Sequence, residues 1–276
     1  MITLKKTIPI FLVFTLLFFN CEEAIIVDLT TEPPRLVIEA SINWRKGTNG
    51  NLQKIKLTNS TDYYNNNTPV VSGATVFIKN NSSNTSFSFI ESPQTGEYVC
   101  TNFIPVLNES YTLTVINNGN TYTASETLKP VAPITRVEQN NNGSITGSEI
   151  EIRAFYTDPD NEKNYYLYKY SYSNQAKKDY YVNEDTFYQG LDFFSISQNT
   201  HFKKGDTVEI THYGISNSYF NYMNIVLSNS RNSENNPFQT PPVITKGNIR
   251  NITNPNQPPL GYFSLSEIDT KTFTIQ

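Results

Sequence analysis

The chain has 276 residues and a formal net charge of −4, and 37% of its residues are hydrophobic. This length suits one large or two ordinary domains, each with its own core. The acidic balance argues against nucleic acid as the main partner, and a mean hydropathy of −0.44 argues against a polytopic membrane protein. Abundant Tyr and Phe suit strands and abundant Asn suits turns, so the composition favours an all-β protein.

Residues 1–20 have the parts of an export signal. Lys5 and Lys6 precede an apolar run over residues 8–19, which is too short to cross a bilayer comfortably as a helix. Cys21 follows at once, and lipoprotein signals are cleaved directly before a cysteine whose thiol takes the lipid. We therefore predict a lipoprotein signal peptide over residues 1–20 and a covalent lipid, such as palmitate, on Cys21. The alternatives are an ordinary signal peptide with an incidental cysteine and a membrane-anchoring helix.

The residues that flank Cys21 indicate where the protein lies. Asn20 departs from the Gly, Ala or Ser that usually precedes the lipidated cysteine, which resembles the looser signals of Bacteroidota. Glu22 and Glu23 resemble the surface-export signals of the same bacteria. We therefore expect a lipid-anchored protein of the outer membrane, exposed on the cell surface, with a periplasm-facing position as the alternative. With Cys21 lipidated, Cys100 has no disulfide partner and should pack as a small apolar residue in a strand.

An N-terminal domain is predicted over residues 35–129, after an acylated tether at residues 21–34. In its first strand, residues 35–43, every second residue is apolar, which is typical of a half-buried strand. Asn118-Gly119 is a strong hairpin-turn signal. Further strands are expected over residues 52–57, 74–78, 86–90, 96–100, 111–116 and 121–127. Short strands at this spacing indicate a β-sandwich of the prealbumin-like or immunoglobulin-like kind.

A second β domain is predicted over residues 136–276, after a proline-containing linker at residues 130–135. One of its segments has helical periodicity, because apolar residues recur there at i, i+3, i+4, i+7 and i+8. These residues are Tyr219, Tyr222, Met223, Val226 and Leu227. We predict a single packed helix near residues 217–231, with Ser216 or Ser218 as its N-cap. The predicted fold class is therefore mainly β, with two β-sandwich-like domains and one helix in the second.

Four oxygen-bearing residues lie close together in the chain, Asp158, Asp160, Asn161 and Glu162. Ca²⁺ takes roughly six to eight oxygen ligands, so this segment is a candidate cation-binding site, although its spacing is not that of an EF-hand. The same residues form an ideal turn between two predicted strands, and the turn is the favoured interpretation. No Cys-based metal site is expected, because Cys100 stands alone once Cys21 carries lipid.

Trp44 and a row of tyrosines at alternate positions from Tyr166 to Tyr172 are candidates for stacking on sugar rings. A period-two aromatic face in a strand is more typical of a core, and this is the favoured interpretation for the tyrosines. A ligand-stacking role therefore falls to Trp44 alone.

The remaining ionisable candidates carry no motif. His201 and His212, the only histidines, have neither zinc-ligand nor catalytic spacing around them and are interpreted as ordinary strand or loop residues. Glu184 and Asp185 are a candidate acidic site, but a solvated loop entering a strand is the favoured interpretation. The sequence therefore predicts no catalytic residue.

Six sequence segments are spread along both predicted domains. In order they are CEEAIIVDL, PRLVIEASI, FYTDPDNEKNYYLYKY, NEDTFYQG, FKKGDTVEITHYGIS and NPFQTPPVITKGNI. Together they resemble a Bacteroidota family, domain of unknown function 4249, along nearly the whole mature chain. The resemblance implies outer-membrane lipoproteins that are often encoded beside TonB-dependent receptors, and it implies no catalytic residue.

These features together predict a non-enzymatic accessory lipoprotein of the outer membrane that assists a TonB-dependent receptor or ligand uptake. A glycan-binding surface protein is the alternative, and an uncharacterised hydrolase is the third hypothesis. The expected partners are the outer membrane, through the lipid on Cys21, and a TonB-dependent receptor, with no nucleic acid. No cofactor is expected beyond that lipid, and Ca²⁺ is a candidate only at Asp158 to Glu162.

Overall fold

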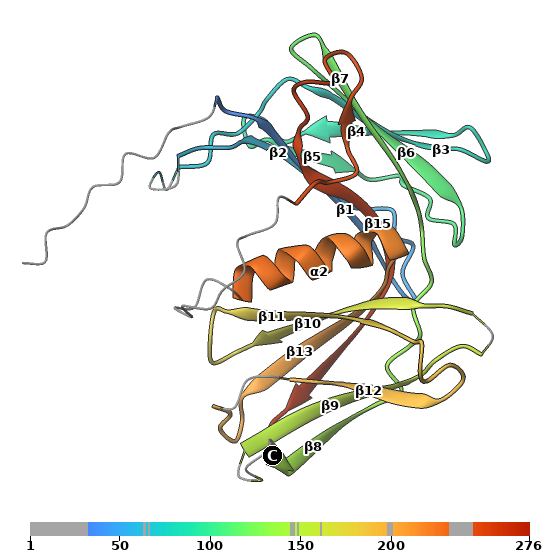
Figure 1. The fold of residues 1–276 in the computed structure, drawn as a ribbon, viewed down its shortest axis with the longest axis vertical. Helices are drawn as coiled ribbons and strands as arrows, with labels where there is room; N and C mark the ends of the chain where they lie inside the picture. The colour runs from blue at the N-terminus through green and yellow to red at the C-terminus, as the bar shows by residue number, and fades with distance from the viewer. Residues whose placement is uncertain are drawn as a thin grey trace, which may run out of the picture. The chain divides into compact units, whose positions relative to one another are not determined.

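Strands make up most of the described part of the chain, and a single helix accompanies them there (Figure 1). The structure is a computed structural model. It describes residues 33–276 except 63–64, 66, 144–146, 148, 161, 198–200 and 232–244. The predicted signal peptide and the lipidation site Cys21 lie outside the described residues. Within those residues, no helix has the length and apolar character needed to cross a membrane. The predicted fold class, mainly β, is confirmed.

The strands in chain order are β1 (Leu36–Arg45), β2 (Gln53–Asn59), β3 (Thr75–Asn80), β4 (Ser86–Glu91), β5 (Glu97–Cys100), β6 (Ser110–Asn117), β7 (Asn120–Thr127), β8 (Arg136–Gly143), β9 (Glu149–Thr157), β10 (Tyr165–Tyr172), β11 (Lys178–Glu184), β12 (Asp192–Ile196), β13 (Thr207–Gly214), β14 (Arg250–Asn251) and β15 (Leu260–Thr274). The helix, α2 (Asn217–Arg231), lies between β13 and β14 in the chain.

Two sheets contain all of these strands. The larger has the spatial order β11-β10-β13-β15-β1-β2-β5-β4-β3-β6-β7-β14, and the smaller has the order β12-β9-β8. Paired strands are antiparallel, except that β15 runs parallel to β1. The C-terminal strand therefore lies between β13 and β1 and joins the first and last thirds of the chain in one sheet.

The local signals read from the sequence correspond to these strands. In β1 the alternate residues Leu36, Ile38, Ala40 and Ile42 are all buried, as the period-two pattern predicts. Asn118 and Gly119 connect β6 to β7 with φ angles of 47° and 76°, which is the left-handed geometry of a tight hairpin. Cys100 is buried in a strand, at the end of β5, as predicted, and its thiol is free.

The described chain buries two separate hydrophobic clusters. The first core lies among β1 to β7, and the second lies between the β10-β13-β15 part of the large sheet and the small sheet. Along the chain, Leu128 still belongs to the first core and Val131 already belongs to the second, so the change falls at the predicted linker. The predicted boundaries assign β15 wholly to the second domain, but Phe263 of β15 packs in the first core and Ile275, just after it, in the second. Figure 1 shows β15 running from one group of strands into the other.

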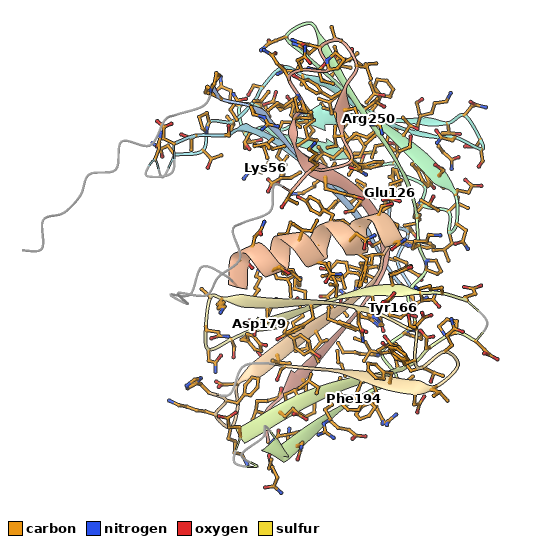
Figure 2. The ribbon with its side chains drawn as sticks, viewed as in Figure 1. Lys56, Glu126, Tyr166, Asp179, Phe194 and Arg250 are labelled. Atoms are coloured by element: carbon orange, nitrogen blue, oxygen red, sulfur yellow. The ribbon has the colours of Figure 1, made fainter. Side chains whose placement is uncertain are left out.

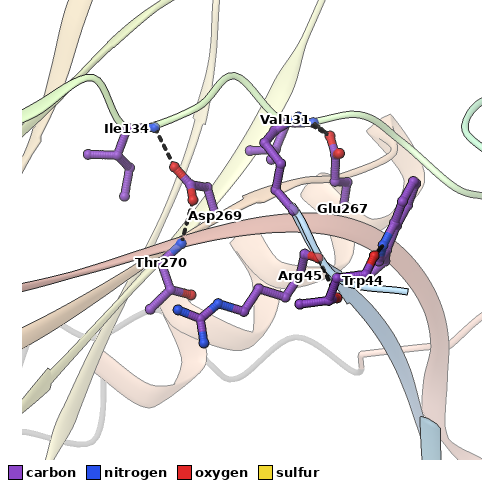
Figure 3. Close-up of polar contacts among 9 residues, drawn as sticks. Trp44, Arg45, Val131, Ile134, Glu267, Asp269 and Thr270 are labelled. Carbon is purple, nitrogen blue, oxygen red and sulfur yellow. Dashed lines mark hydrogen bonds and ion pairs between the residues drawn. The ribbon is translucent and has the colours of Figure 1, made fainter. Parts of the chain in front are cut away.

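The predicted linker lies along β15 and is bonded to it (Figure 3). Glu267 Oε2 accepts the Val131 N–H at 3.0 Å, and Asp269 Oδ2 accepts the Ile134 N–H at 2.7 Å. Glu267 is 3% exposed and also forms an ion pair with Lys46 at 2.9 Å. Because this buried carboxylate has both a cation and a backbone donor, it ties the linker to the β1–β15 pair.

Helix α2 has the bounds that the apolar periodicity predicts. Ser216 Oγ accepts the Tyr219 N–H at 3.1 Å, so Ser216 rather than Ser218 is the N-cap. The rings of Tyr219 and Tyr222 pack on Tyr262 of β15, with centroid distances of 4.8 and 4.6 Å. The helix also contacts β10 and β11. The prediction of a single packed helix is confirmed for the part of the chain that is described.

Replacing Ser216 with alanine is expected to destabilise the protein by about 1–2 kcal/mol. The change removes the helix cap and also the hydroxyl that donates to Glu126 Oε2 at 2.9 Å. Urea unfolding monitored by circular dichroism measures the effect. Ser218→Ala is the matched control, because Ser218 is exposed in the first turn of the helix. An equal loss of stability in both variants would contradict the capping role of Ser216.

Candidate functional site

A groove of about 890 Å³ opens next to the start of β15. Three of its lining side chains are cationic, and they come from two separate parts of the chain: Arg35 from one, and Lys246 and Arg250 from the other. We term it the basic groove. Arg250 lies with the strands of the first core, whereas Tyr166 lies with those of the second (Figure 2). The volume is within the range of small-molecule sites in proteins.

Arg35 is fixed in the wall of the basic groove. It lies directly before β1, and its guanidinium donates from Nε and Nη2 to the Pro258 carbonyl oxygen at 3.1 and 2.9 Å. Its backbone N–H donates to Ser60 Oγ at 2.9 Å. These bonds anchor Arg35 to two other segments, so its charge is in position before any ligand binds. Lys246 and Arg250 are exposed.

Two glycines allow the backbone around the groove to pack closely. A Cβ on Gly247 would lie 1.8 Å from the carbonyl oxygen of Gly261, which is too close for any residue other than glycine. The neighbouring Asn248 continues this contact, since its Nδ2 donates to Phe263 O at 2.8 Å and its Oδ1 accepts the Phe263 N–H at 2.9 Å. The segment that carries Lys246 is therefore bonded along β15, which places that lysine at the groove.

The charge and lining of the basic groove suit an anion with apolar parts. Its three cations produce a positive potential in a concave site, and Ile249, Ile252 and Leu260 offer apolar contacts. A guanidinium can also bind a carboxylate or phosphate through two parallel hydrogen bonds. None of the described lining residues is His, Cys, Asp or Glu. The described lining of the groove therefore offers binding groups without an acid–base pair.

The residues predicted as a cation site differ in their surroundings. Asp158 is 2% exposed, whereas Asp160 and Glu162 are exposed at the surface. Asn161 lies outside the described residues. Among those that are described, no three His, Cys, Asp or Glu side chains form a group that fits a metal ion. The segment connects β9 to β10, which is the turn that the sequence favours.

Asp158 instead lies close to Asp185, an acid at the end of another strand. Asp185, interpreted from the sequence as a solvated loop residue, is 0% exposed, so that interpretation is wrong. Burial raises the pKa of Asp158 to about 6, and the Asp185 carboxyl adds to the rise. The Tyr166 hydroxyl donates to Asp158 Oδ1 at 2.6 Å and opposes the rise. Asn164, which the sequence did not single out, bonds to Asp185 through its backbone.

Trp44 is half-buried at the edge of the first core. Its Nε1 donates to Thr48 O at 2.8 Å, and a Cβ on Gly50 would lie 2.5 Å from its Cδ1. The chain itself therefore covers part of the indole, and sugar stacking on Trp44 stays a prediction. The tyrosine row of β10 belongs to the second core, as favoured from the sequence. Its members are Tyr166, Tyr168, Tyr170 and Tyr172.

The two histidines have unlike surroundings. His201 lies in an exposed loop, whereas His212 is buried in β13. The His212 ring lies between 4.6 and 4.8 Å from those of Tyr156, Tyr166 and Tyr168, measured between centroids. Burial lowers the pKa of His212 to about 3, so the ring is neutral at pH 7. Its aromatic neighbours give it the role of a core residue.

The profile of one protein family, described as "Domain of unknown function (DUF4249)", matches residues 22–272. The chain belongs to this family. The DUF4249 match includes every lining residue of the basic groove as well as Asp158, Asn164 and Asp185. No curated protein matches the chain in sequence. A solved two-domain fibronectin type-III segment from chicken tenascin is similar at 10% identity and a TM-score of 0.21, over 58% of this chain and 83% of that one.

Proposed function

We propose that this DUF4249 protein is a non-enzymatic outer-membrane lipoprotein of Bacteroidota that assists a TonB-dependent receptor by holding an anionic ligand. The basic groove carries the proposal, because it joins a ligand-sized volume to three cationic side chains and has no acid–base pair among its described lining residues. The export signal and Cys21 support the location.

The position of the groove in the sequence fits a site close to a membrane. Arg35 comes 14 residues after Cys21. A fully extended chain of that length spans about 50 Å at most. A lipid on Cys21 would therefore keep the groove within reach of a receptor in the same membrane, where tethering raises the effective concentration of each partner for the other.

The accessory role is tested by a pull-down from detergent-solubilised outer membranes. Tagged protein with native Cys21 is compared with a Cys21→Ala variant, and the recovered proteins are identified by mass spectrometry. We expect the native form to recover one β-barrel receptor and the variant to recover less of it. Recovery of the lipidated protein without any receptor would count against the accessory role.

The ligand role of the groove is tested on the same purified protein. Small anions released by denaturation are compared between the parent chain and a Lys246→Gln/Arg250→Gln variant, which keeps the structural bonds of Arg35. We expect at least a tenfold loss of the bound anion, since two charge-assisted contacts disappear. Lys56→Gln/Lys271→Gln removes two exposed lysines outside the groove and is the matched control. Equal anion content in all three proteins would refute an anion-binding groove.

A further inference from the structure

Three strand ends of the second core bring two carboxyl groups and an amide together. Asp158 directly follows β9, Asp185 directly follows β11, and Asn164 directly precedes β10. The backbone fixes two of them to each other, because the Asp185 N–H donates to Asn164 O at 3.3 Å and the Asn164 N–H donates to Asp185 Oδ2 at 2.6 Å. The Asp185 carboxyl lies close enough to Asp158 to raise the pKa of that acid.

Each carboxylate has one oxygen that accepts a hydrogen bond and a second oxygen that does not. Asp158 Oδ1 accepts from Tyr166 and Asp185 Oδ2 from Asn164. The other oxygens, Asp158 Oδ2 and Asp185 Oδ1, are buried and make no well-aligned hydrogen bond within the described chain, and the same is true of Asn164 Oδ1. The Gly190 backbone N–H lies close enough to Asp158 to lower its pKa in part. Both acids are more than nine-tenths buried. Buried acceptors without a donor are costly, so three of them at one place require an explanation.

No cationic side chain of the described chain compensates these acids. No Lys, Arg or His nitrogen there lies within 4.0 Å of either carboxylate. Lys163, which directly precedes Asn164, pairs instead with Glu184 at 3.0 Å. A proton shared by the two acids would join one oxygen of each in a hydrogen bond but would leave the Asn164 amide oxygen without a donor. A cation satisfies all three oxygens at once.

We propose that Asp158, Asp185 and Asn164 bind one Ca²⁺ ion. Carboxylate and amide oxygens are the ligands that Ca²⁺ takes, and water or backbone carbonyls commonly complete its shell. A pocket of about 250 Å³ lies next to Asn164, which lines it together with Glu162 and Tyr165. The bound ion would link the ends of β9, β10 and β11. This site shares no residue with the basic groove, so the proposal does not rest on the proposed function.

Calcium titration of the full chain, purified in detergent and freed of metal with a chelator, tests the proposal. Isothermal calorimetry is expected to show one Ca²⁺ per chain with a Kd of about 10⁻³ M or tighter. Saturating Ca²⁺ is expected to raise the Tm by about 3–10 °C, since it binds the folded chain only. Absence of both the binding heat and the Tm rise in the unmodified chain would overturn the proposal and leave the shared proton as the explanation.

Two asparagine variants locate the ion. Asp158→Asn and Asp185→Asn each remove one charged ligand and are expected to weaken Ca²⁺ binding at least tenfold. In chelator, each variant should be at least as stable as the metal-free parent, because one of two adjacent like charges is gone. Asp62→Asn, an exposed acid of the first part of the chain, is the matched control and should bind Ca²⁺ like the parent. Unchanged affinity in both site variants would place the ion elsewhere and refute the assignment.

Discussion

Replacing Gly261 with alanine is expected to lower the free energy of unfolding by about 3–5 kcal/mol. Gly261 has a φ of +100°, and a Cβ there would lie 2.1 Å from the carbonyl oxygen of Ile38 in the paired strand β1. The side chain would therefore strain the backbone of β15 and also force the β1–β15 pair apart. Guanidinium unfolding measures the loss, as a lower midpoint at an unchanged slope.

Gly205→Ala separates these two effects. Gly205 has a similar φ of +93°, but a Cβ there would meet nothing within 4 Å. Its replacement should cost only the backbone strain, about 1–3 kcal/mol, and should leave strand pairing intact. A cost for Gly261→Ala no larger than that for Gly205→Ala would show that β1 and β15 do not approach each other as closely as the structure has them.

The local elements could be predicted from the sequence because each carries its own periodicity or turn chemistry. The alternation in β1, the hairpin at Asn118-Gly119 and the i, i+3, i+4 pattern of α2 are set by residues a few positions apart. Burial of one face then stabilises each element against the neighbouring layer. Such signals need no knowledge of which strand lies next to which.

The pairing of β15 with β1 could not be predicted in this way. It joins Val37 to Leu260 and Arg45 to Ile268, across more than two hundred residues of chain. No short-range signal specifies a parallel pairing over that separation, since its stability comes from contacts formed only in the complete fold. The contiguous division into two domains overlooked β15 for this reason.

The candidate sites show the same division between local and distant signals. Asp158 stands out in the sequence because it lies in a short acidic turn, but its partner Asp185 follows another strand and looked like a solvated acid. Arg35 is more than two hundred residues away from Lys246 and Arg250 in the sequence, and the three cations come together only in the lining of the basic groove. Sequence composition can indicate that a site is acidic or basic, but the fold decides which charges meet.

Lowering the pH from 7 to 4 is expected to cost the parent chain about 3 kcal/mol of stability through His212 alone. Burial among three tyrosine rings lowers its pKa in the folded chain to about 3, from an ordinary value of 6.5. Below pH 6.5 the imidazole of His212 therefore binds a proton in the unfolded chain, whereas in the folded chain it stays neutral down to about pH 3. The stability that His212 contributes is complete above pH 6.5, falls as the pH drops through this window, and is lost below pH 3.

His212→Phe isolates this contribution from that of the carboxylates. Phenylalanine keeps an aromatic ring between Tyr156, Tyr166 and Tyr168, and neither imidazole nitrogen makes a well-aligned hydrogen bond that it would lose. The backbone of Ala132 lies close to the imidazole and partly opposes the lowering of the His212 pKa. Urea unfolding of both proteins is measured from pH 7 to pH 4. Over this range the parent should lose about 3 kcal/mol more of its free energy of unfolding than the variant loses. If the stability difference between the two proteins stays constant over this range, His212 titrates near its ordinary pKa and is not buried in the second core.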